Sequence, residues 1–348
     1  MRLPRRPSIR LHVALCCGLA VAGAALASRP AYAQSSEVPP ASAPSDAASQ
    51  PTSQPTSQPA SEPKGVSKVA DVAAIGPATT VYVHDACVRG PGCAKAVTDA
   101  LLATPAVPRT VGISFAGTNR ALDSTLEQLA RLATHPKITE VTLTTSGVRG
   151  QTLETVLCAL AKLPVIELTV RDGSAGSGAL RCLPAFRRLA TLGVYDLPLA
   201  AGLMKDLGAA ASLTTLRLQT RHLRDADLRP LGGLVRLELL DLSNSPVTGA
   251  GFVALSSLPA LETLVLLGTR VTNAALRHLA KLPRLASIDA TETSVTATGF
   301  LPHLKGFPAL KEVALSAEHE TTPASRKLAR RRPPIKVTYY GECMVGDE

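Results

Sequence analysis

The sequence predicts an α/β solenoid in which short repeats stack side by side along one continuous core. A 24-residue phrase begins at Leu213, Leu237, Leu261 and Leu285, and it returns at Leu310 after 25 residues. Within each repeat, apolar residues first alternate with the two-residue period of a strand and then follow the spacing of a short helix or 3₁₀ segment. One such unit cannot bury its own apolar edge, whereas a stack of units can.

The phrase Leu-x-x-Leu-x-Leu-x-x-Thr-x-Val-Thr, read directly from Leu261 to Thr272, resembles the leucine-rich repeat family. The similarity is to the bacterial variety that carries Thr where other subfamilies carry Asn or Cys. Thr269 and Thr293 hold that position here, as does Ser245 one repeat earlier. The resemblance implies a curved solenoid with a parallel β-sheet on its concave face and short helices on its convex face. It also implies a binding role, with no catalytic residues to carry over.

Residues 1–33 have the pattern of an export signal peptide. Four arginines precede an apolar run over residues 11–27, and Ala31-Tyr32-Ala33 forms a small-x-small cleavage site. Cleavage after Ala27 is one alternative. Retention of the segment as a membrane anchor is another, although this Ala- and Gly-rich run is short for a membrane span. Export predicts a periplasmic, cell-surface or secreted protein.

Residues 34–76 are rich in Pro, Ser, Ala, Thr and Gln, so a disordered linker is expected there. The solenoid is expected over residues 77–348. Atypical repeats or a cap are expected over 77–137, regular repeats over 138–316, and a C-terminal cap and tail over 317–348. The earliest regular repeat is expected to begin at Ile138 and to be 27 residues long. Further strands are expected near residues 80–84, 111–115 and 335–339.

The charge of the chain limits the kinds of partner. The signal segment holds five arginines and no acidic residue, so its removal lowers the formal net charge from +10 to +5. A mild positive charge indicates at most attraction to anionic surfaces. The basic run at residues 326–332 has no interleaved aromatic residues, so we expect a solvated capping helix and no nucleic-acid partner. We expect a monomer that contacts a membrane only if its N-terminal segment is retained.

Five cysteines remain after removal of the signal segment. Cys87 and Cys93 flank a Gly-Pro-Gly turn and could close a small loop as a disulfide. Cys158 and Cys182 lie at nearly matching places on neighbouring convex segments. Adjacent helices lie about 8–10 Å apart, whereas a disulfide needs Cα atoms within about 7 Å. We therefore expect two buried thiols at these positions, and an unpaired Cys343.

The sequence favours no catalytic, metal or cofactor site. His84, Cys87 and Cys93 supply three metal ligands at most, and structural zinc usually takes four. The Gly-rich segment 172–178 follows a strand but lacks the lysine of a phosphate-binding loop. His-Glu-x-x-His and Gly-x-Ser-x-Gly motifs are absent from the sequence. We therefore expect a non-enzymatic protein without a metal or cofactor.

The remaining signal lies on the predicted concave face. Side chains two, four and six positions after each leading residue point away from the core. Most of them are small and hydroxylated, which is typical of a solvated sheet face. The larger exceptions form the candidate ligand-binding site: Arg171, Tyr195, Arg217, Asp241, Val265 and Leu267. Tyr and Arg are over-represented among binding anchors, and exposed aliphatic side chains beside them could form an apolar centre.

The repeat register predicts which of these residues are neighbours. Arg171 is expected beside Tyr195 in one column, and Arg217, Asp241 and Val265 are expected to be consecutive in the next. These two columns are expected to begin at Thr144 and Thr142, respectively. Arg217 beside Asp241 could form an exposed ion pair, which would contribute only about 0–1 kcal/mol to folding.

The leading hypothesis for function is an exported recognition module that binds a protein or peptide on its concave face. A passive envelope structural or tethering protein is the alternative from another class. Binding of an envelope glycan is a further alternative, although the aromatic stacking platforms that sugars use are largely missing.

Overall fold

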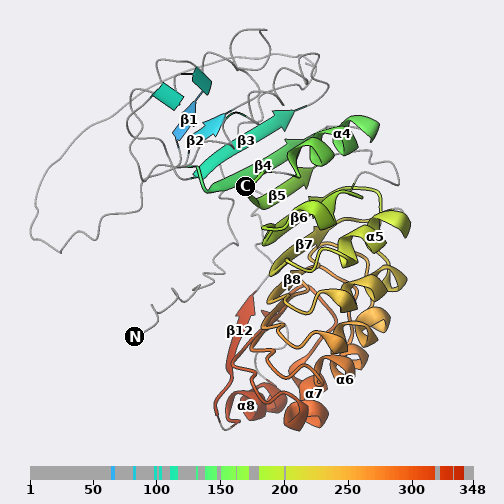
Figure 1. The fold of residues 1–348 in the computed structure, drawn as a ribbon. Coiled ribbons are helices and arrows are strands. Elements are labelled where there is room, and N and C mark those ends of the chain that lie inside the picture. The colour runs from blue at the N-terminus through green and yellow to red at the C-terminus, as the bar shows by residue number, and fades with distance from the viewer. Residues whose placement is uncertain are drawn as a thin grey trace, which may run out of the picture. The chain divides into compact units, whose positions relative to one another are not determined.

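The strands form one parallel sheet whose order follows the chain from β1 to β12 (Figure 1). The computed structural model describes residues 64–66, 81–83, 98–99, 102–103, 110–116, 131, 138–146, 150–161, 163–171, 180–199, 201–317, 322–331 and 333–340. The expected signal segment, Cys87 and Cys93, the Gly-rich segment 172–178 and Cys343 lie outside these residues.

Each strand pairs with the strand of the preceding repeat. The described strands are β1 (Lys64–Val66), β2 (Val81–Val83), β3 (Thr110–Ala116), β4 (Glu140–Ser146), β5 (Val165–Arg171), β6 (Thr191–Tyr195), β7 (Thr215–Gln219), β8 (Leu239–Asp241), β9 (Thr263–Val265), β10 (Ser287–Ala290), β11 (Glu312–Ser316) and β12 (Lys336–Tyr340). The strands expected near residues 80–84, 111–115 and 335–339 are confirmed as β2, β3 and β12.

Short helices return the chain from one strand to the next. Within the described residues they are α4 (Gly150–Leu160), η2 (Leu183–Ala185), α5 (Ala201–Gly208), η3 (Asp225–Gly233), η4 (Ala250–Val253), η5 (Leu255–Ser257), η6 (Asn273–Ala275), α6 (Leu276–Leu279), α7 (Ala297–Phe300), η7 (Leu301–Gly306) and α8 (Pro323–Ala329), where η marks a 3₁₀ helix. Figure 1 shows α4 to α7 on the side of the stack away from the strand arrows. In the part of the chain that the structure describes, no helix is long and apolar enough to cross a bilayer.

The core lies between the strands and the helices. In the repeat that contains β9, Leu261, Leu264 and Leu266 are fully buried, whereas Thr263 and Val265 are half-exposed. Because strand side chains alternate between the two faces, this pattern confirms the predicted register of the central repeats. Four buried phenylalanines are the largest core side chains: Phe186, Phe252, Phe300 and Phe307. The α/β solenoid predicted from the repeats is therefore confirmed.

The Ser or Thr that holds the same position in three successive repeats is buried and hydrogen-bonded: Ser245, Thr269 and Thr293. Thr269 and Thr293 donate their hydroxyls to the backbone carbonyls of Leu266 and Ala290, in their own repeats. Ser245 instead donates to the carbonyl of Leu218 in the preceding repeat, at 2.9 Å. A buried hydroxyl without a partner is costly, so these bonds explain how a polar residue is accommodated beside a leucine core.

The register between β4 and β5 differs from the prediction. Val141 pairs with Val165, but Thr142 pairs with Glu167, because a bulge leaves Ile166 without a partner. The first regular repeat therefore does not begin at Ile138, and it is not 27 residues long. Ile138 is buried but lies before β4, so it is an additional apolar residue and not the leading residue of the repeat.

The same bulge changes the start of both columns on the open face of the sheet. Thr144, not Thr142, lies beside Thr169, and Ser146, not Thr144, lies beside Arg171. An apolar pattern cannot reveal such a shift, because the bulge keeps Val141 and Leu143 on the buried side.

Strand β1 falls inside the segment 34–76, where the sequence analysis expects a linker. Its three residues pair in parallel with Val81, Tyr82 and Val83 of β2. A strand this short carries little sequence signal, since strand patterns are recognised over runs of about four to eight residues.

Helix α8 and strand β12 follow β11 at the C-terminal end of the described residues. Helix α8 begins after Thr322, whose side chain accepts a hydrogen bond from the backbone N–H of Ser325. Leu328 is buried, whereas Arg326 and Lys327 are exposed. Arg331, which follows the helix, donates a hydrogen bond to the backbone carbonyl of Phe307, so only part of the basic run lies on the exposed face of α8. The expected C-terminal cap over residues 317–348 stays a prediction.

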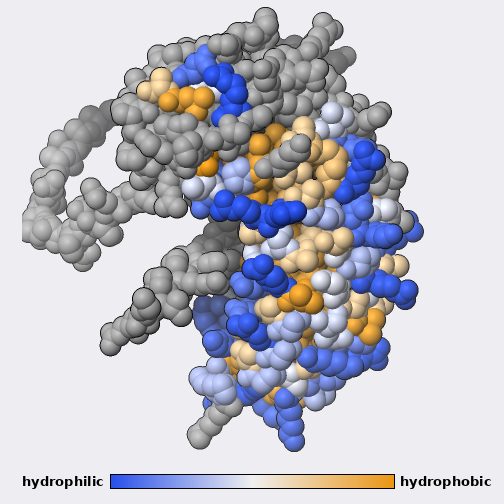
Figure 2. All heavy atoms as spheres, in the orientation of Figure 1, coloured by the Kyte–Doolittle hydropathy of each residue, from blue (hydrophilic) through white to orange (hydrophobic). Residues whose placement is uncertain are grey.

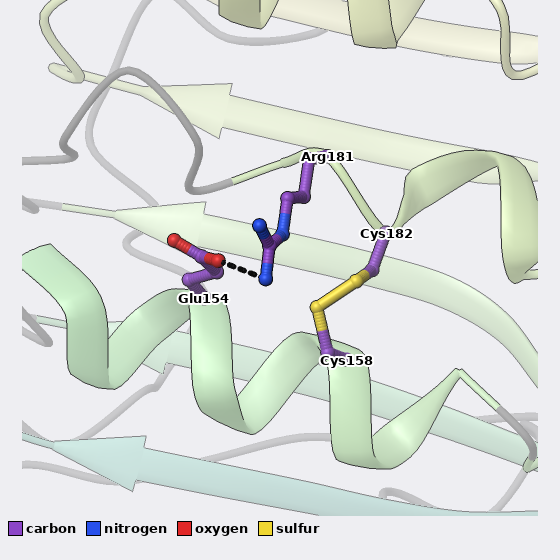
Figure 3. Close-up of polar contacts among 4 residues, drawn as sticks. All are labelled: Glu154, Cys158, Arg181 and Cys182. Atoms are coloured by element: carbon purple, nitrogen blue, oxygen red, sulfur yellow. Dashed lines mark ion pairs between the residues drawn. A yellow bond between two sulfur atoms is a disulfide. The ribbon is translucent and has the colours of Figure 1, made fainter.

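Cys158 and Cys182 form a disulfide, so the expectation of two buried thiols is wrong (Figure 3). Their Cα atoms are 5.2 Å apart. Cys158 lies on α4, but Cys182 lies in the turn that leads into the 3₁₀ helix η2, so the separation of two packed α-helices does not apply. Arg181 beside it forms an ion pair with Glu154 of α4 at 2.6 Å. Two contacts therefore join this pair of convex segments.

Candidate ligand-binding face

Five of the six candidate residues lie on strands of the sheet, and Leu267 lies in the turn after β9. We call the face that these side chains line the strand face. It is lined by the side chains that alternate with the buried leucines. Arg171 pairs with Tyr195 between β5 and β6. Arg217 of β7 pairs with Asp241 of β8, which pairs with Val265 of β9. The predicted neighbours in both columns are therefore confirmed.

Arg171 and Tyr195 form a stacked pair. The guanidinium carbon of Arg171 lies 4.0 Å from the centroid of the Tyr195 ring. Arg171 is exposed and Tyr195 is half-exposed, so the pair stands at the surface. At an exposed site such a cation–π contact contributes about 0.5–1 kcal/mol. Its main consequence is that each side chain restricts the rotamers of the other.

Gly193 provides the surface beneath the Tyr195 ring. A Cβ atom at Gly193 would lie 2.7 Å from Cε2 of Tyr195, closer than a real contact allows. The ring therefore lies over the glycine and toward the column that holds Arg217, the residue that pairs with Gly193. The role of Gly193 was not predicted from the sequence. It could have been suspected because a glycine stands in a column whose next members, Arg217, Asp241 and Val265, are larger.

Although Asp241 is the register partner of Arg217, the two side chains form no ion pair, so the ion pair that the sequence made possible is not present. Its Oδ1 atom accepts hydrogen bonds from the backbone N–H and the hydroxyl of Ser243, at 2.9 and 2.5 Å. Its Oδ2 atom accepts one from Nε2 of Gln219 at 2.8 Å. The side chain is only 8% exposed. An Asp that bonds the backbone two residues on is a common turn device, and here it takes the carboxylate away from the arginine.

The same device recurs two repeats later. Asp289 accepts hydrogen bonds from the backbone N–H and the hydroxyl of Thr291, at 3.0 and 2.6 Å. It too is only 8% exposed. We conclude that these two aspartates shape the ends of their strands.

Arg171 and Arg217 keep their charges unpaired within the described residues. No ion pair joins either guanidinium to a carboxylate in that part of the chain. Arg217 is half-exposed. Their N–H groups are therefore available to a molecule that approaches the strand face.

Val265 and Leu267 form an apolar end of the strand face. Both are half-exposed, whereas Leu264 and Leu266 beside them are buried. Val265 lies between Asp241 and Asp289, which pair with it from the two adjacent strands.

A cavity on the convex side is a competing location. It has a volume of about 860 Å³ and lies beside the disulfide. Cys158, Arg187 and Arg188 contribute to its lining, and the other described lining residues are Ala, Leu and Pro. In Figure 2, hydrophobic residues gather over the region that α4 occupies in Figure 1. The lining residues that the structure describes include no carboxylate, imidazole or hydroxyl group.

His278 is a titratable side chain of helix α6, on the convex side. His278 has a pKa below its ordinary value, because partial burial and the nearby charges of Arg277 and Lys281 disfavour the imidazolium. Its Nε2 atom accepts a hydrogen bond from Nε of Arg277 at 3.1 Å. Among the described residues, no group of three or more His, Cys, Asp or Glu side chains could hold a metal ion.

Comparison with known proteins gives matches only among solved structures. No family model and no curated protein matches the chain. An internalin from Listeria monocytogenes is 11% identical, with a TM-score of 0.41 over 68% of this chain and 71% of that chain. TLR13 in its complex with ssRNA13 is 18% identical, with a TM-score of 0.45 over 69% of this chain and 33% of that chain.

A third match is the ectodomain of the receptor kinase GASSHO1/SCHENGEN3 from Arabidopsis thaliana in complex with CASPARIAN STRIP INTEGRITY FACTOR 2. It is 17% identical, with a TM-score of 0.40 over 68% of this chain and 26% of that chain. These three similarities concern the course of the backbone and say nothing about what this chain binds. The 24-residue repeat, its buried leucines and the parallel sheet in chain order together make the fold a leucine-rich repeat solenoid.

Proposed function

We propose that this chain is an exported, non-enzymatic recognition module that binds a protein or peptide on its concave strand face. The observation that carries the proposal is the stacked pair of Arg171 and Tyr195. It lies beside the unpaired Arg217, on the same face as Val265 and Leu267. Large side chains that are already ordered lose little entropy on binding.

The arrangement has the parts that a recognition surface needs. A Tyr and two Arg side chains can act as anchors, since these residue types dominate measured binding energies. Two half-exposed aliphatic residues lie further along the same face and provide apolar contact area. These five side chains are not engaged in hydrogen bonds within the described part of the fold, whereas Asp241 accepts hydrogen bonds from Ser243 and Gln219. We therefore assign Asp241 a supporting role.

Export is supported by two independent features. The segment 1–33 has the pattern of a signal peptide. The disulfide between Cys158 and Cys182 is typical of an oxidising compartment. N-terminal sequencing of the native protein should give a start at Gln34 or at Ser28. An intact Met1 in membrane fractions would replace this proposal with an anchored protein.

A paired-variant experiment tests the binding face. A partner is first captured from the native envelope with the parent chain, and its affinity is then measured for the variant Tyr195→Ala with Arg217→Ala. We expect normal folding and a loss of at least about 30-fold in affinity, because loss of an anchor commonly costs about 2 kcal/mol of binding.

Arg277→Ala with His278→Ala, on the convex side, is the control and should bind as the parent does. A convex pair that abolishes binding while the strand-face pair retains it would show that the assigned face is wrong. Capture of a glycan alone would favour the glycan alternative, and capture of nothing would favour a tethering role.

A further inference from the structure

We infer that the partner presents an Asp or Glu carboxylate to the end of the strand face formed by Arg171, Tyr195 and Arg217. This inference rests on the proposed function and adds the chemistry of the partner. We call these three residues the cationic end, and we call Val265 and Leu267 the apolar end.

The first step is the balance of charge at the cationic end. Two guanidiniums lie on adjacent columns, and neither forms an ion pair within the described residues. Asp241 is the carboxylate that pairs in register with Arg217, but its two oxygens accept hydrogen bonds from Gln219 and Ser243. Glu167 lies on the same strand as Arg171 and makes no ion pair with either arginine. Neither Asp241 nor Glu167 therefore neutralises the positive charge of Arg171 and Arg217 through an ion pair.

The second step is the geometry of Arg171. Its guanidinium carbon lies over the Tyr195 ring, 4.0 Å from the ring centroid. The five N–H groups of a guanidinium lie in its plane, so stacking leaves them free to donate outward. A carboxylate accepts two such bonds side by side, which gives it both strength and a defined orientation. A stacked and unpaired arginine is therefore better suited to a carboxylate than to an apolar or cationic group.

The third step is the role of Gly193. Because the glycine has no side chain, the Tyr195 ring can occupy the space over Gly193 while Arg171 lies over the ring. The ring lies toward the column that contains Gly193 and its register partner Arg217. The two cationic groups therefore approach one region from two columns. A side chain at position 193 would displace the ring and remove the support of Arg171.

The fourth step is the distance to the apolar end. Neighbouring strands lie about 4.8 Å apart, so β7 and β9 are separated by about 10 Å and β5 and β9 by about 19 Å. An extended peptide covers about 3.3 Å per residue. A peptide that lies across the strands would thus place an aliphatic side chain about three to six residues from its acidic residue.

Selection from a random 12-residue phage-displayed peptide library tests the inference directly. The full chain as purified is immobilised with its disulfide intact. We expect the enriched peptides to carry Asp or Glu, with an aliphatic residue about three to six positions away. Synthetic copies should bind Arg171→Gln with Arg217→Gln at least about tenfold more weakly, since a hydrogen bond to a charged group commonly contributes a tenfold or larger factor.

Matched variants separate this inference from the proposed function. Arg229→Gln with Arg277→Gln removes two exposed arginines from the convex side and should bind the peptides as the parent does. Arg171→Lys with Arg217→Lys retains the charges and should recover part of the affinity. Folding of every variant is checked by its thermal unfolding curve.

Each outcome has a defined meaning. A selection that enriches no acidic sequence overturns the inference. Peptides that lose affinity for Val265→Ser with Leu267→Ser, but not for the double Gln variant, also overturn it and leave the proposed function standing. Peptides that bind both variants as they bind the parent overturn the proposed function as well. Binding by the acidic peptides that weakens with added salt and requires both arginines supports it.

Discussion

The repeats from β4 to β6 and those from β7 to β10 join to their neighbours in different ways. In the first group, a disulfide links Cys158 to Cys182, and an ion pair links Glu154 to Arg181 (Figure 3). In the second group, side chains at matching positions bond across repeats without covalent links. Asp225 accepts hydrogen bonds from the next repeat, and Asn273 does the same with Thr296.

The strand face differs between the same two groups. Around β5 to β7, the polar groups of Arg171 and Arg217 remain available. Around β8 to β10, Asp241 and Asp289 accept hydrogen bonds from Ser243 and Thr291. Position on a face therefore does not by itself identify a binding residue. A polar side chain that satisfies the backbone of its own strand is part of the fold, and one that leaves its donors free is available to a partner.

The largest effect is expected from the register on which the comparison depends. Leu264→Asp places a carboxylate at a position that is fully buried and paired with Leu240 and Ile288. Burial of an unpaired charge costs several kcal/mol or forces a large pKa shift. We expect loss of the cooperative unfolding transition of these repeats, measured by circular dichroism in urea. Thr263→Asp, one position along and half-exposed, should retain the transition, and equal effects of the two variants would contradict the register.

Removal of the disulfide is expected to have the next largest effect. Cys158→Ser with Cys182→Ser opens a link across a sequence separation of 24 residues. Links of this length typically contribute about 2–4 kcal/mol to the free energy of unfolding. We expect the urea midpoint of the double variant to fall, and the parent treated with a reductant to fall equally. A parent whose midpoint is unchanged by the reductant would show that the upstream repeats do not depend on the covalent link.

A smaller and pH-dependent effect is expected at Asp225 in the second group. Its carboxylate accepts bonds from the N–H groups of Thr248, Gly249 and Gly251 at 3.0–3.1 Å, and from the Thr248 hydroxyl at 2.9 Å. Partial burial raises its pKa, but the hydrogen bonds from Gly251, Thr248 and Gly249 outweigh burial, so the pKa lies below 3.8. Asp225→Ala should lower the free energy of unfolding by about 1–2 kcal/mol at pH 7, measured by urea titration.

The sign of the pH dependence follows from that lowered pKa. The contribution of Asp225 is present in full above the ordinary Asp pKa near 4. It declines as the pH falls below that value and through the lower pKa of the folded state. The difference in stability between the parent and Asp225→Ala should therefore be constant from pH 7 to pH 5 and shrink below pH 4. A difference that grows as the pH falls would contradict this assignment.

Sequence periodicity was sufficient for the fold, because buried residues such as Leu240 and Leu264 must recur at fixed offsets for repeats to stack. It also placed Arg171 beside Tyr195. It could not reveal the bulge at Ile166, since that residue leaves the apolar pattern intact. The disulfide could not be predicted from the spacing of packed α-helices, because Cys182 lies in a turn, although the 24-residue separation of the two cysteines equals one repeat.

The details of the strand face lay beyond the sequence for a different reason. The pairing of strands fixes the positions of the Cβ atoms, but it does not determine the side-chain rotamers beyond them. Asp241 turns to its own strand and Tyr195 turns over Gly193. Both depend on rotamers that the repeat pattern leaves open.

The smallest effect on the free energy of unfolding is expected at Arg217, which lies beside Asp241 in the same column of the strand face. Arg217→Ala removes a side chain with no ion pair among the described residues, so the free energy of unfolding should change by less than about 0.5 kcal/mol. Asp241→Ala leaves the donors of Ser243 and Gln219 without their acceptor and should cost about 1–2 kcal/mol. Urea titration of both variants and of the double variant measures the difference.

Because no ion pair couples the two residues, the two effects should add within about 0.5 kcal/mol. A larger coupling would show that the arginine and the aspartate interact after all, and the division of the strand face into structural and available residues would then fail at its central column.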